Sequence, residues 1–117
     1  ADALAQEFGS RVQALDWSER NEALIGATLL INTTNQGMHG QPSLNIELTQ
    51  LPTTALVSDI IYVPLETPLL EAARLRGNTT VNGLGMLLHQ ARPAFRAWFG
   101  VMPEVTPMLR DAIITTL

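Results

Sequence analysis

Strand-like and helix-like patterns of apolar residues alternate along this chain of 117 residues. The clearest strand is the nearly continuous apolar run at 56–63, which is typical of a parallel strand that is covered on both faces. Shorter apolar runs at 28–32 and 79–81 predict two more strands, and the alternation at 11–15 predicts a fourth. Apolar residues at helical spacing, together with capping residues, predict helices at 1–8, 18–26, 67–77, 84–99 and 106–116.

The order of these elements predicts an α/β fold, in which a parallel sheet carries helices on both faces and two helices follow at the C-terminus. The polar stretch at 39–54 contains two prolines, so we expect a long connection with little regular structure. No internal repeat and no second domain are visible. The first predicted helix has neither a capping residue nor a methionine before it, and we therefore expect the natural chain to extend upstream.

Composition excludes several classes of function. The net charge is −4, and seven basic residues spread along the chain do not supply the basic face that nucleic-acid binding needs. No apolar run approaches the roughly 18 residues of a membrane helix. The absence of cysteine removes disulfides and thiolate chemistry and fits a cytoplasmic protein. The two histidines, His39 and His89, have no acidic partner at metal-ligand spacing, so no metal site is expected.

Candidate chemistry lies where polar residues follow apolar strands, because ligands of open parallel sheets bind beyond the carboxyl ends of the strands. The segments in question are 32–35, Tyr62 and 82–83. For Asn32 and Thr33 the pattern favours turn formation over ligand binding, since both side chains bond readily to nearby backbone. For Tyr62 the pattern slightly favours a core aromatic over a ligand-binding group.

Four further residues suggest roles at the same edge of the sheet. Asp59 stands among apolar neighbours, and we interpret it as a loop anchor that accepts backbone amides rather than as a catalytic group. Gly83 begins the longest helix, where a glycine lets a ligand approach the backbone amides. Met86 and Gln90 lie on the same side of that helix. Glutamine donates and accepts hydrogen bonds at once, which suits a polyol, although a solvated glutamine and a core methionine are the commoner alternatives. No nucleophile-base pair is visible, and the chain has no lysine.

A longer pattern runs through most of the chain. Its parts are INTTNQGM at 31–38, DIIYVPLETPLL at 59–70, VNGLGMLLHQA at 81–91 and the C-terminal stretch at 94–103. In order and spacing these segments resemble the shikimate and quinate dehydrogenases. Two positions depart from the family's pattern: Asn82 stands where aspartate is usual, and Val63 where asparagine or glutamine is common. The first leaves the following turn neutral, and the second removes a polar neighbour of Tyr62.

The resemblance implies an NADP-dependent shikimate dehydrogenase with a Rossmann-type fold, an oxidoreductase that reversibly reduces 3-dehydroshikimate in aromatic amino acid biosynthesis. It implies that Tyr62 and Gln90 contact the substrate. It also implies that five residues lie along NADP near the nicotinamide: Thr34, Ile60, Gly83, Met86 and Leu87. The family's catalytic lysine and aspartate belong to an N-terminal domain, and its glycine-rich phosphate loop would precede residue 1. We therefore expect no catalytic residue here, and no activity from the chain alone.

The same resemblance divides the chain into two parts. Residues 1–83 correspond to the later part of the NADP-binding domain, and residues 84–117 to helices that pack toward a missing substrate domain. Such packing would explain why 46% of the residues are hydrophobic and only 15% are charged. An NAD-dependent quinate/shikimate dehydrogenase and a non-catalytic binding or assembly module stay open as alternatives. An exposed domain face also leaves a homodimer open.

Overall fold

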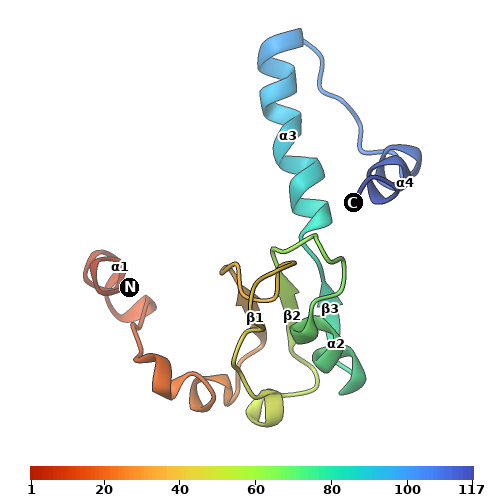
Figure 1. Cartoon of the computed structure of the whole chain (residues 1–117). Coiled ribbons are helices and arrows are strands. Elements are labelled where there is room, and N and C mark those ends of the chain that lie inside the picture. Colours follow the sequence, from red (N-terminus) through yellow and green to blue (C-terminus); the bar gives the residue numbers. More distant parts are fainter.

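The computed structural model describes residues 1–117, which form four α-helices and a small parallel sheet of three strands (Figure 1). In chain order the elements are α1 (Asp2–Phe8), β1 (Leu29–Asn32), β2 (Leu56–Asp59), α2 (Pro68–Leu75), β3 (Thr79–Val81), α3 (Leu84–Phe99) and α4 (Pro107–Ile114). Short 3-10 helices lie at Gly9–Arg11, Trp17–Glu19, Glu22–Leu24 and Leu48–Gln50. The predicted α/β class with a parallel sheet is confirmed.

The sheet brings the ends of its strands together at one edge. The strands pair in the order β1-β2-β3, and both pairs are parallel. The register places Asn32 beside Asp59 where β1 and β2 end, and Ser58 beside Val81 in the second pair. Because parallel strands share a direction, the polar segments that follow β1, β2 and β3 leave the sheet at the same edge.

One face of the sheet carries the core. Helix α2 packs against β2 and β3, and the long connection between β1 and β2 covers the rest of this face. That connection is irregular, as predicted, apart from the 3-10 helix at Leu48–Gln50, yet it supplies the buried Leu48 and Leu51. The buried cluster consists of Leu24, Leu48, Leu51, Ala55, Val57, Leu69, Leu70 and Ala73.

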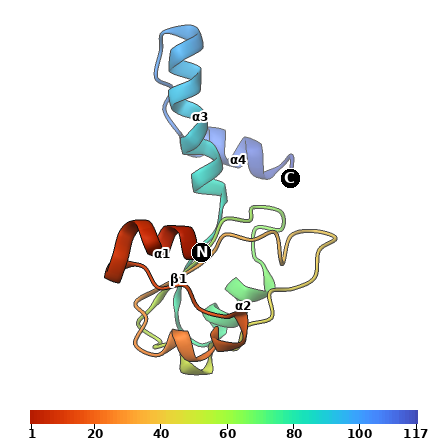
Figure 2. The same cartoon turned by 90° about the vertical axis from the view of Figure 1, so that its left-hand side faces the viewer.

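The opposite face of the sheet is open in this chain. Leu29, Ile31 and Val81 are 47%, 48% and 48% exposed. The register puts Ile31 and Val81 on the same face, on either side of Ser58. Figure 1 shows α1 set apart from the sheet, and Figures 1 and 2 show α3 and α4 extending beyond its edge. Helices were expected on both faces, but within this chain they cover one face only.

Two predictions near the N-terminus are wrong. The segment 11–15 forms no strand, because no neighbouring strand offers it ladder hydrogen bonds, and an unpaired strand is not stable by itself. The helix predicted at 18–26 is replaced by two 3-10 turns. Asp16, and not Ser18, caps the first of them: its carboxylate accepts from the Ser18 amide at 2.9 Å, and the Glu19 carboxylate accepts from the Asp16 amide at 3.1 Å. Runs this short do not sustain an α-helix.

The strand predicted at 56–63 ends four residues early, at Asp59. Its neighbours β1 and β3 end at Asn32 and Val81, so the ladder has no partner strand beyond this point. Two single hydrogen bonds continue instead, from the Ile60 amide to the Asn32 carbonyl at 3.1 Å and from the Gly83 amide to the Ile61 carbonyl at 2.8 Å. The apolar run therefore leaves the sheet and becomes a loop.

The predicted later helices and the strands at 28–32 and 79–81 are confirmed to within a few residues. The hydroxyl of Thr67 caps α2 by accepting from the Leu70 amide at 3.3 Å. The hydroxyl of Thr106 caps α4 in the same way through Leu109, at 3.2 Å. Gly100 ends α3 with a left-handed φ of 74°. None of these helices has both the length and the apolar character that crossing a bilayer requires.

Candidate functional site

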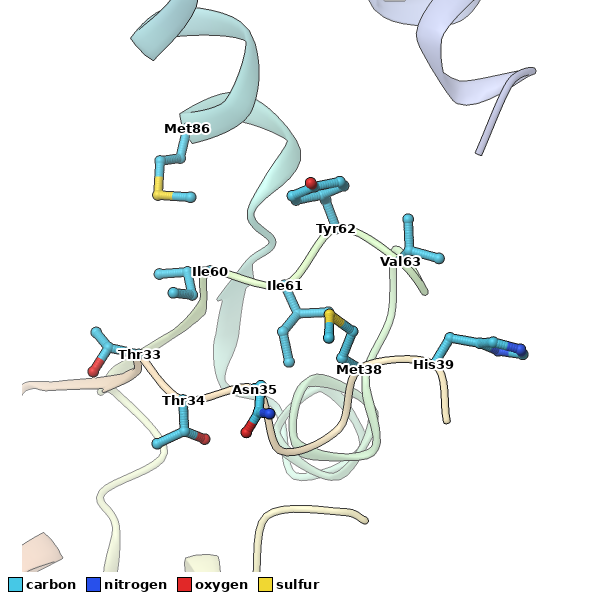
Figure 3. A pocket seen from close by; sticks show the side chains of 10 residues that line it. All are labelled: Thr33, Thr34, Asn35, Met38, His39, Ile60, Ile61, Tyr62, Val63 and Met86. Atoms are coloured by element: carbon cyan, nitrogen blue, oxygen red, sulfur yellow. The ribbon is translucent and has the colours of Figure 1, made fainter. Parts of the chain in front are cut away.

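A pocket of about 570 Å³ lies beyond the ends of β1 and β2, beside the start of α3. Two loops and one helical side chain form it (Figure 3). The lining residues are Thr33, Thr34, Asn35, Met38, His39, Ile60, Ile61, Tyr62, Val63 and Met86. This is the edge of the sheet where parallel α/β folds bind their ligands.

The first wall is a turn that Asn32 builds. The buried Asn32 side chain accepts from the Thr34 amide at 3.0 Å and from the Thr34 hydroxyl at 2.8 Å. Its amide group donates to the Gln36 carbonyl at 3.1 Å. The interpretation of Asn32 as a turn former is thus confirmed, while Thr33, Thr34 and Asn35 are exposed and line the pocket.

The second wall, 60–63, starts directly after Asp59. This side chain is 1% exposed. It accepts from the Ile61 amide at 3.1 Å, from the Thr67 hydroxyl at 2.7 Å and from the side-chain amide of Asn32, which is 3.2 Å from each carboxylate oxygen. The interpretation of Asp59 as a loop anchor is confirmed, and a buried carboxylate with this many donors needs no ligand to satisfy it.

Tyr62 carries the most versatile polar group of the second wall. Its side chain is half-buried and points into the same space as Ile60 and Met86 (Figure 3). No protein group forms a hydrogen bond with its hydroxyl in the structure. A half-buried tyrosine that lines a pocket is not a core residue, so the core interpretation is wrong. The role of Tyr62 in ligand binding stays a prediction.

Gly83 sets the distance between the loop and α3. A Cβ atom built on this buried glycine would overlap the carbonyl oxygen of Ile60. The Gly83 amide donates to the Ile61 carbonyl at 2.8 Å, so the first turn of α3 lies against the 60–63 loop. That contact brings Met86 to the pocket opposite Ile60. The φ of Gly83 is −73°, so space and not backbone conformation requires a glycine here.

Three of the seven predicted site residues do not line this pocket. Leu87 lines a second, largely apolar cavity of about 560 Å³ between α3 and α4. Gln90 is exposed, one turn beyond Met86 on α3, and lines neither cavity. Four of the seven predicted residues therefore meet at the first pocket, namely Thr34, Ile60, Tyr62 and Met86. Gly83 is not part of the lining, but it allows the first turn of α3 to lie against the 60–63 loop that forms one wall.

Sequence patterns missed part of the rim. Met38 and His39 reach the pocket because the His39 amide donates to the Val63 carbonyl at 3.1 Å, which joins the two loops. Nothing in the local sequence signals that contact. The lining contains no arginine, aspartate or glutamate. The ion pair between Glu66 and Arg74, at 2.7 Å, lowers the pKa of Glu66 chiefly through the hydrogen bond, but it lies outside the pocket.

No group of three or more histidine, aspartate or glutamate side chains stands close enough to hold a metal ion. A parallel sheet with a ligand-sized pocket beyond the carboxyl ends of neighbouring strands is the arrangement of Rossmann-like α/β domains. These observations define the class of protein.

Comparison with known proteins specifies the family. A family model described as the shikimate 5'-dehydrogenase C-terminal domain matches residues 83–111. A shikimate dehydrogenase (NADP(+)) of Paramagnetospirillum magneticum is 54% identical over 115 residues, which are 98% of this chain and 42% of that protein. The one of Azorhizobium caulinodans is 53% identical over 117 residues, which are 100% of this chain and 42% of that protein.

Solved structures agree. The quinate dehydrogenase of Corynebacterium glutamicum in complex with NAD has a TM-score of 0.83 at 32% identity, and the match covers 98% of this chain and 41% of that protein chain. The shikimate 5-dehydrogenase of Thermus thermophilus in complex with NADP(H) and shikimate has a TM-score of 0.79 at 32% identity, and the match covers 100% of this chain and 42% of that protein chain. The chain belongs to the shikimate dehydrogenase family and corresponds to its C-terminal portion. It spans about 42% of the length of these relatives.

Proposed function

We propose that this chain forms the nicotinamide side of the active site in an NADP-dependent shikimate dehydrogenase, which interconverts shikimate and 3-dehydroshikimate. The observation that carries the proposal is the pocket in which Thr34, Ile60, Tyr62 and Met86 meet. Relatives that are 53% and 54% identical across the chain bear the name shikimate dehydrogenase (NADP(+)). The function thus rests on a site within the chain as well as on similarity.

The pocket fits one end of NADP. Ile60 and Met86 offer apolar surfaces to a flat ring, and Thr34 lies on the opposite rim, where its hydroxyl is bonded within the turn to Asn32 and Gln36. We propose that these three residues hold the nicotinamide, with Gly83 and Leu87 following along the start of α3. When NADP is bound, its nicotinamide ring would accept the hydride from shikimate. No arginine lines the pocket, so we expect the phosphate groups of NADP to be held elsewhere than in this pocket.

Tyr62 and Gln90 are the proposed substrate contacts. The free hydroxyl of Tyr62 can donate to and accept from a substrate hydroxyl or carboxylate. The exposed Gln90 is one turn beyond Met86 on α3, where its amide group can reach a ligand that extends out of the pocket. No carboxylate lines the pocket, and its one imidazole, that of His39, is exposed on the rim. The resemblance to the family instead assigns the proton transfer to the lysine and aspartate of the N-terminal domain.

The alternative of an NAD-dependent quinate dehydrogenase has one supporting observation, the TM-score of 0.83 to the quinate dehydrogenase of Corynebacterium glutamicum. The relatives that are more than 50% identical carry the NADP(+) shikimate name, which favours the first proposal. A homodimer and the cytoplasmic location expected from the cysteine-free sequence stay predictions.

A chimera tests the proposal. Residues 1–117 replace the matching segment of the Azorhizobium caulinodans relative, with which they align over the whole chain at 53% identity. We expect the chimera to reduce NADP in the presence of shikimate, as measured by the absorbance of reduced nicotinamide. The 117-residue chain alone should give no rate. A folded chimera without activity would contradict the proposal, and so would activity of the chain alone.

The two alternatives have their own outcomes in this assay. A ratio of quinate turnover to shikimate turnover that is clearly higher in the chimera than in the parent enzyme would support the second enzyme. A folded chimera that binds neither NADP nor shikimate would support a non-catalytic module. The parent enzyme from Azorhizobium caulinodans, measured beside the chimera, shows that the assay itself works.

A further inference from the structure

Asp59 is connected to every segment that forms the two loop walls of the pocket. One oxygen accepts from the Ile61 amide, in the loop that carries Ile60 and Tyr62. The other accepts from the hydroxyl of Thr67, the cap of α2. Both accept from the side-chain amide of Asn32, which shapes the turn of Thr34. A single buried side chain therefore joins both loops to the core helix.

The connection runs through donors only. The Ile61 amide, the Thr67 hydroxyl and the Asn32 amide group all donate, and the Asp59 carboxylate accepts from each of them. A carboxamide of the same size brings its own N–H donors into this site. Whichever way that group is oriented, a donor then faces the amide of Ile61 or the side-chain amide of Asn32. The site thus selects a carboxylate by hydrogen-bond polarity rather than by shape.

We propose that Asp59 is a positioning residue of the site, which fixes the distance between the Thr34 turn and the Tyr62 loop. It touches neither ligand, since it is 1% exposed and does not line the pocket. It acts on the cofactor side through Asn32 and Thr34, and on the substrate side through Ile61 and Tyr62. The inference rests on the proposed function, because its consequence for ligand binding assumes that NADP and shikimate meet at this pocket.

Asp59→Asn in the chimera tests this role. Small displacements of site residues cost up to about a hundredfold in rate. We expect the KM values for both NADP and shikimate to rise by about tenfold in Asp59→Asn, because one change releases both walls. The matched control is Val57→Ala, two residues earlier in the same strand and fully buried. This control lowers the melting temperature but should leave both KM values unchanged in the folded enzyme.

A second variant asks whether hydrogen-bond polarity is the cause. Adding Asn32→Asp to Asp59→Asn restores an acceptor opposite the new carboxamide, although the bond to the Gln36 carbonyl is lost. The double variant should recover part of the affinity for NADP that Asp59→Asn loses. Asn32→Asp alone places two carboxylates together, so its KM for NADP should be higher than that of Asp59→Asn and of the double variant. An unchanged KM for both ligands in a folded Asp59→Asn chimera would overturn the inference. So would a double variant no better than the single ones.

Hydrogen exchange on the 117-residue chain provides a readout that needs no activity. In Asp59→Asn the amides of Thr34 and Ile61 should exchange at least tenfold faster, whereas the ladder amide of Ser58 should keep its rate. Equal protection of Thr34 and Ile61 in both forms would overturn the role of Asp59. If instead the wild-type chimera lacks activity while these exchange rates change as expected, the proposed function fails and the positioning of the two loops stands.

Discussion

Replacing Gly83 by alanine should destabilise the chain, because the new methyl group has no room. A Cβ atom at this position would overlap the carbonyl oxygen of Ile60 and come within 2.9 Å of the carbonyl oxygen of Ile61. Both neighbours are backbone atoms, so no side-chain rotation relieves the contact. Either the 60–63 loop or the first turn of α3 must move.

The size of the effect follows from these contacts. Forcing an extra methyl group into a packed site costs about 1–3 kcal/mol. Moving the helix away also weakens the hydrogen bond from the Gly83 amide to the Ile61 carbonyl, which adds about 1 kcal/mol. We therefore expect Gly83→Ala to lower the free energy of unfolding by about 2–4 kcal/mol.

Gly85→Ala is the matched control. It lies two residues further in α3, and nothing is within 4 Å of the Cβ atom that it adds. Alanine favours the helix over glycine by up to about 1 kcal/mol, so this variant should gain stability. Urea unfolding followed by far-ultraviolet circular dichroism measures both changes. A Gly83→Ala variant as stable as the wild type, or the same sign of change in both variants, would refute the packing argument.

Three other predictions concern the substrate site, the core and the surface. Tyr62→Phe in the chimera should raise the KM for shikimate by about tenfold with little change in the KM for NADP, because it removes one hydrogen bond to the substrate; equal KM values would count against Tyr62 as a contact. Leu51→Ala should lower the free energy of unfolding by about 2–5 kcal/mol, since Leu51 is 2% exposed, whereas Leu75→Ala, at 73% exposure, should change it little in the same urea titration. The hydrogen bond with Arg74 lowers the pKa of Glu66 below its ordinary value of 4.5, so the pair stabilises the fold above that pH and its contribution is lost as the pH falls through the folded-state pKa. The difference in melting temperature between wild type and Glu66→Gln should accordingly shrink below pH 4.5, and a difference that persists unchanged at pH 3 would contradict it.

Local signals predicted the second half of the chain well. The helix α2 has a threonine cap and a proline in its first turn, and α4 repeats both features, so their starts could be read directly. The strand at 79–81 lies between clear turn residues. These elements are determined by hydrogen bonds and backbone restrictions within a few residues, which a sequence displays.

The features that the sequence did not reveal share a physical cause. The alternation at 11–15 is strand-like, but a strand exists only with a neighbour, and the pairing partner is a non-local property. The polar stretch at 39–54 concealed Leu48 and Leu51, which the chain folds into the core without any regular pattern. Burial in an irregular connection depends on where the rest of the chain passes.

The site was predicted in the same uneven way. The anchoring role of Asp59 followed from one carboxylate in an apolar run. The rim that Met38 and His39 form depends on a hydrogen bond between His39 and Val63, which are distant in sequence. The place of Gln90 relative to the pocket also depends on the direction in which α3 leaves the sheet (Figure 1).

The most direct test of the account is a crystal structure of the chimera with NADP and shikimate bound. We predict the nicotinamide ring between Ile60 and Met86, with the hydroxyl of Tyr62 within hydrogen-bond distance of a shikimate oxygen atom. Asp59 should keep its bonds to Ile61, Thr67 and Asn32. A nicotinamide bound elsewhere, with this pocket occupied only by water, would contradict the central claim that the pocket is the nicotinamide side of the active site.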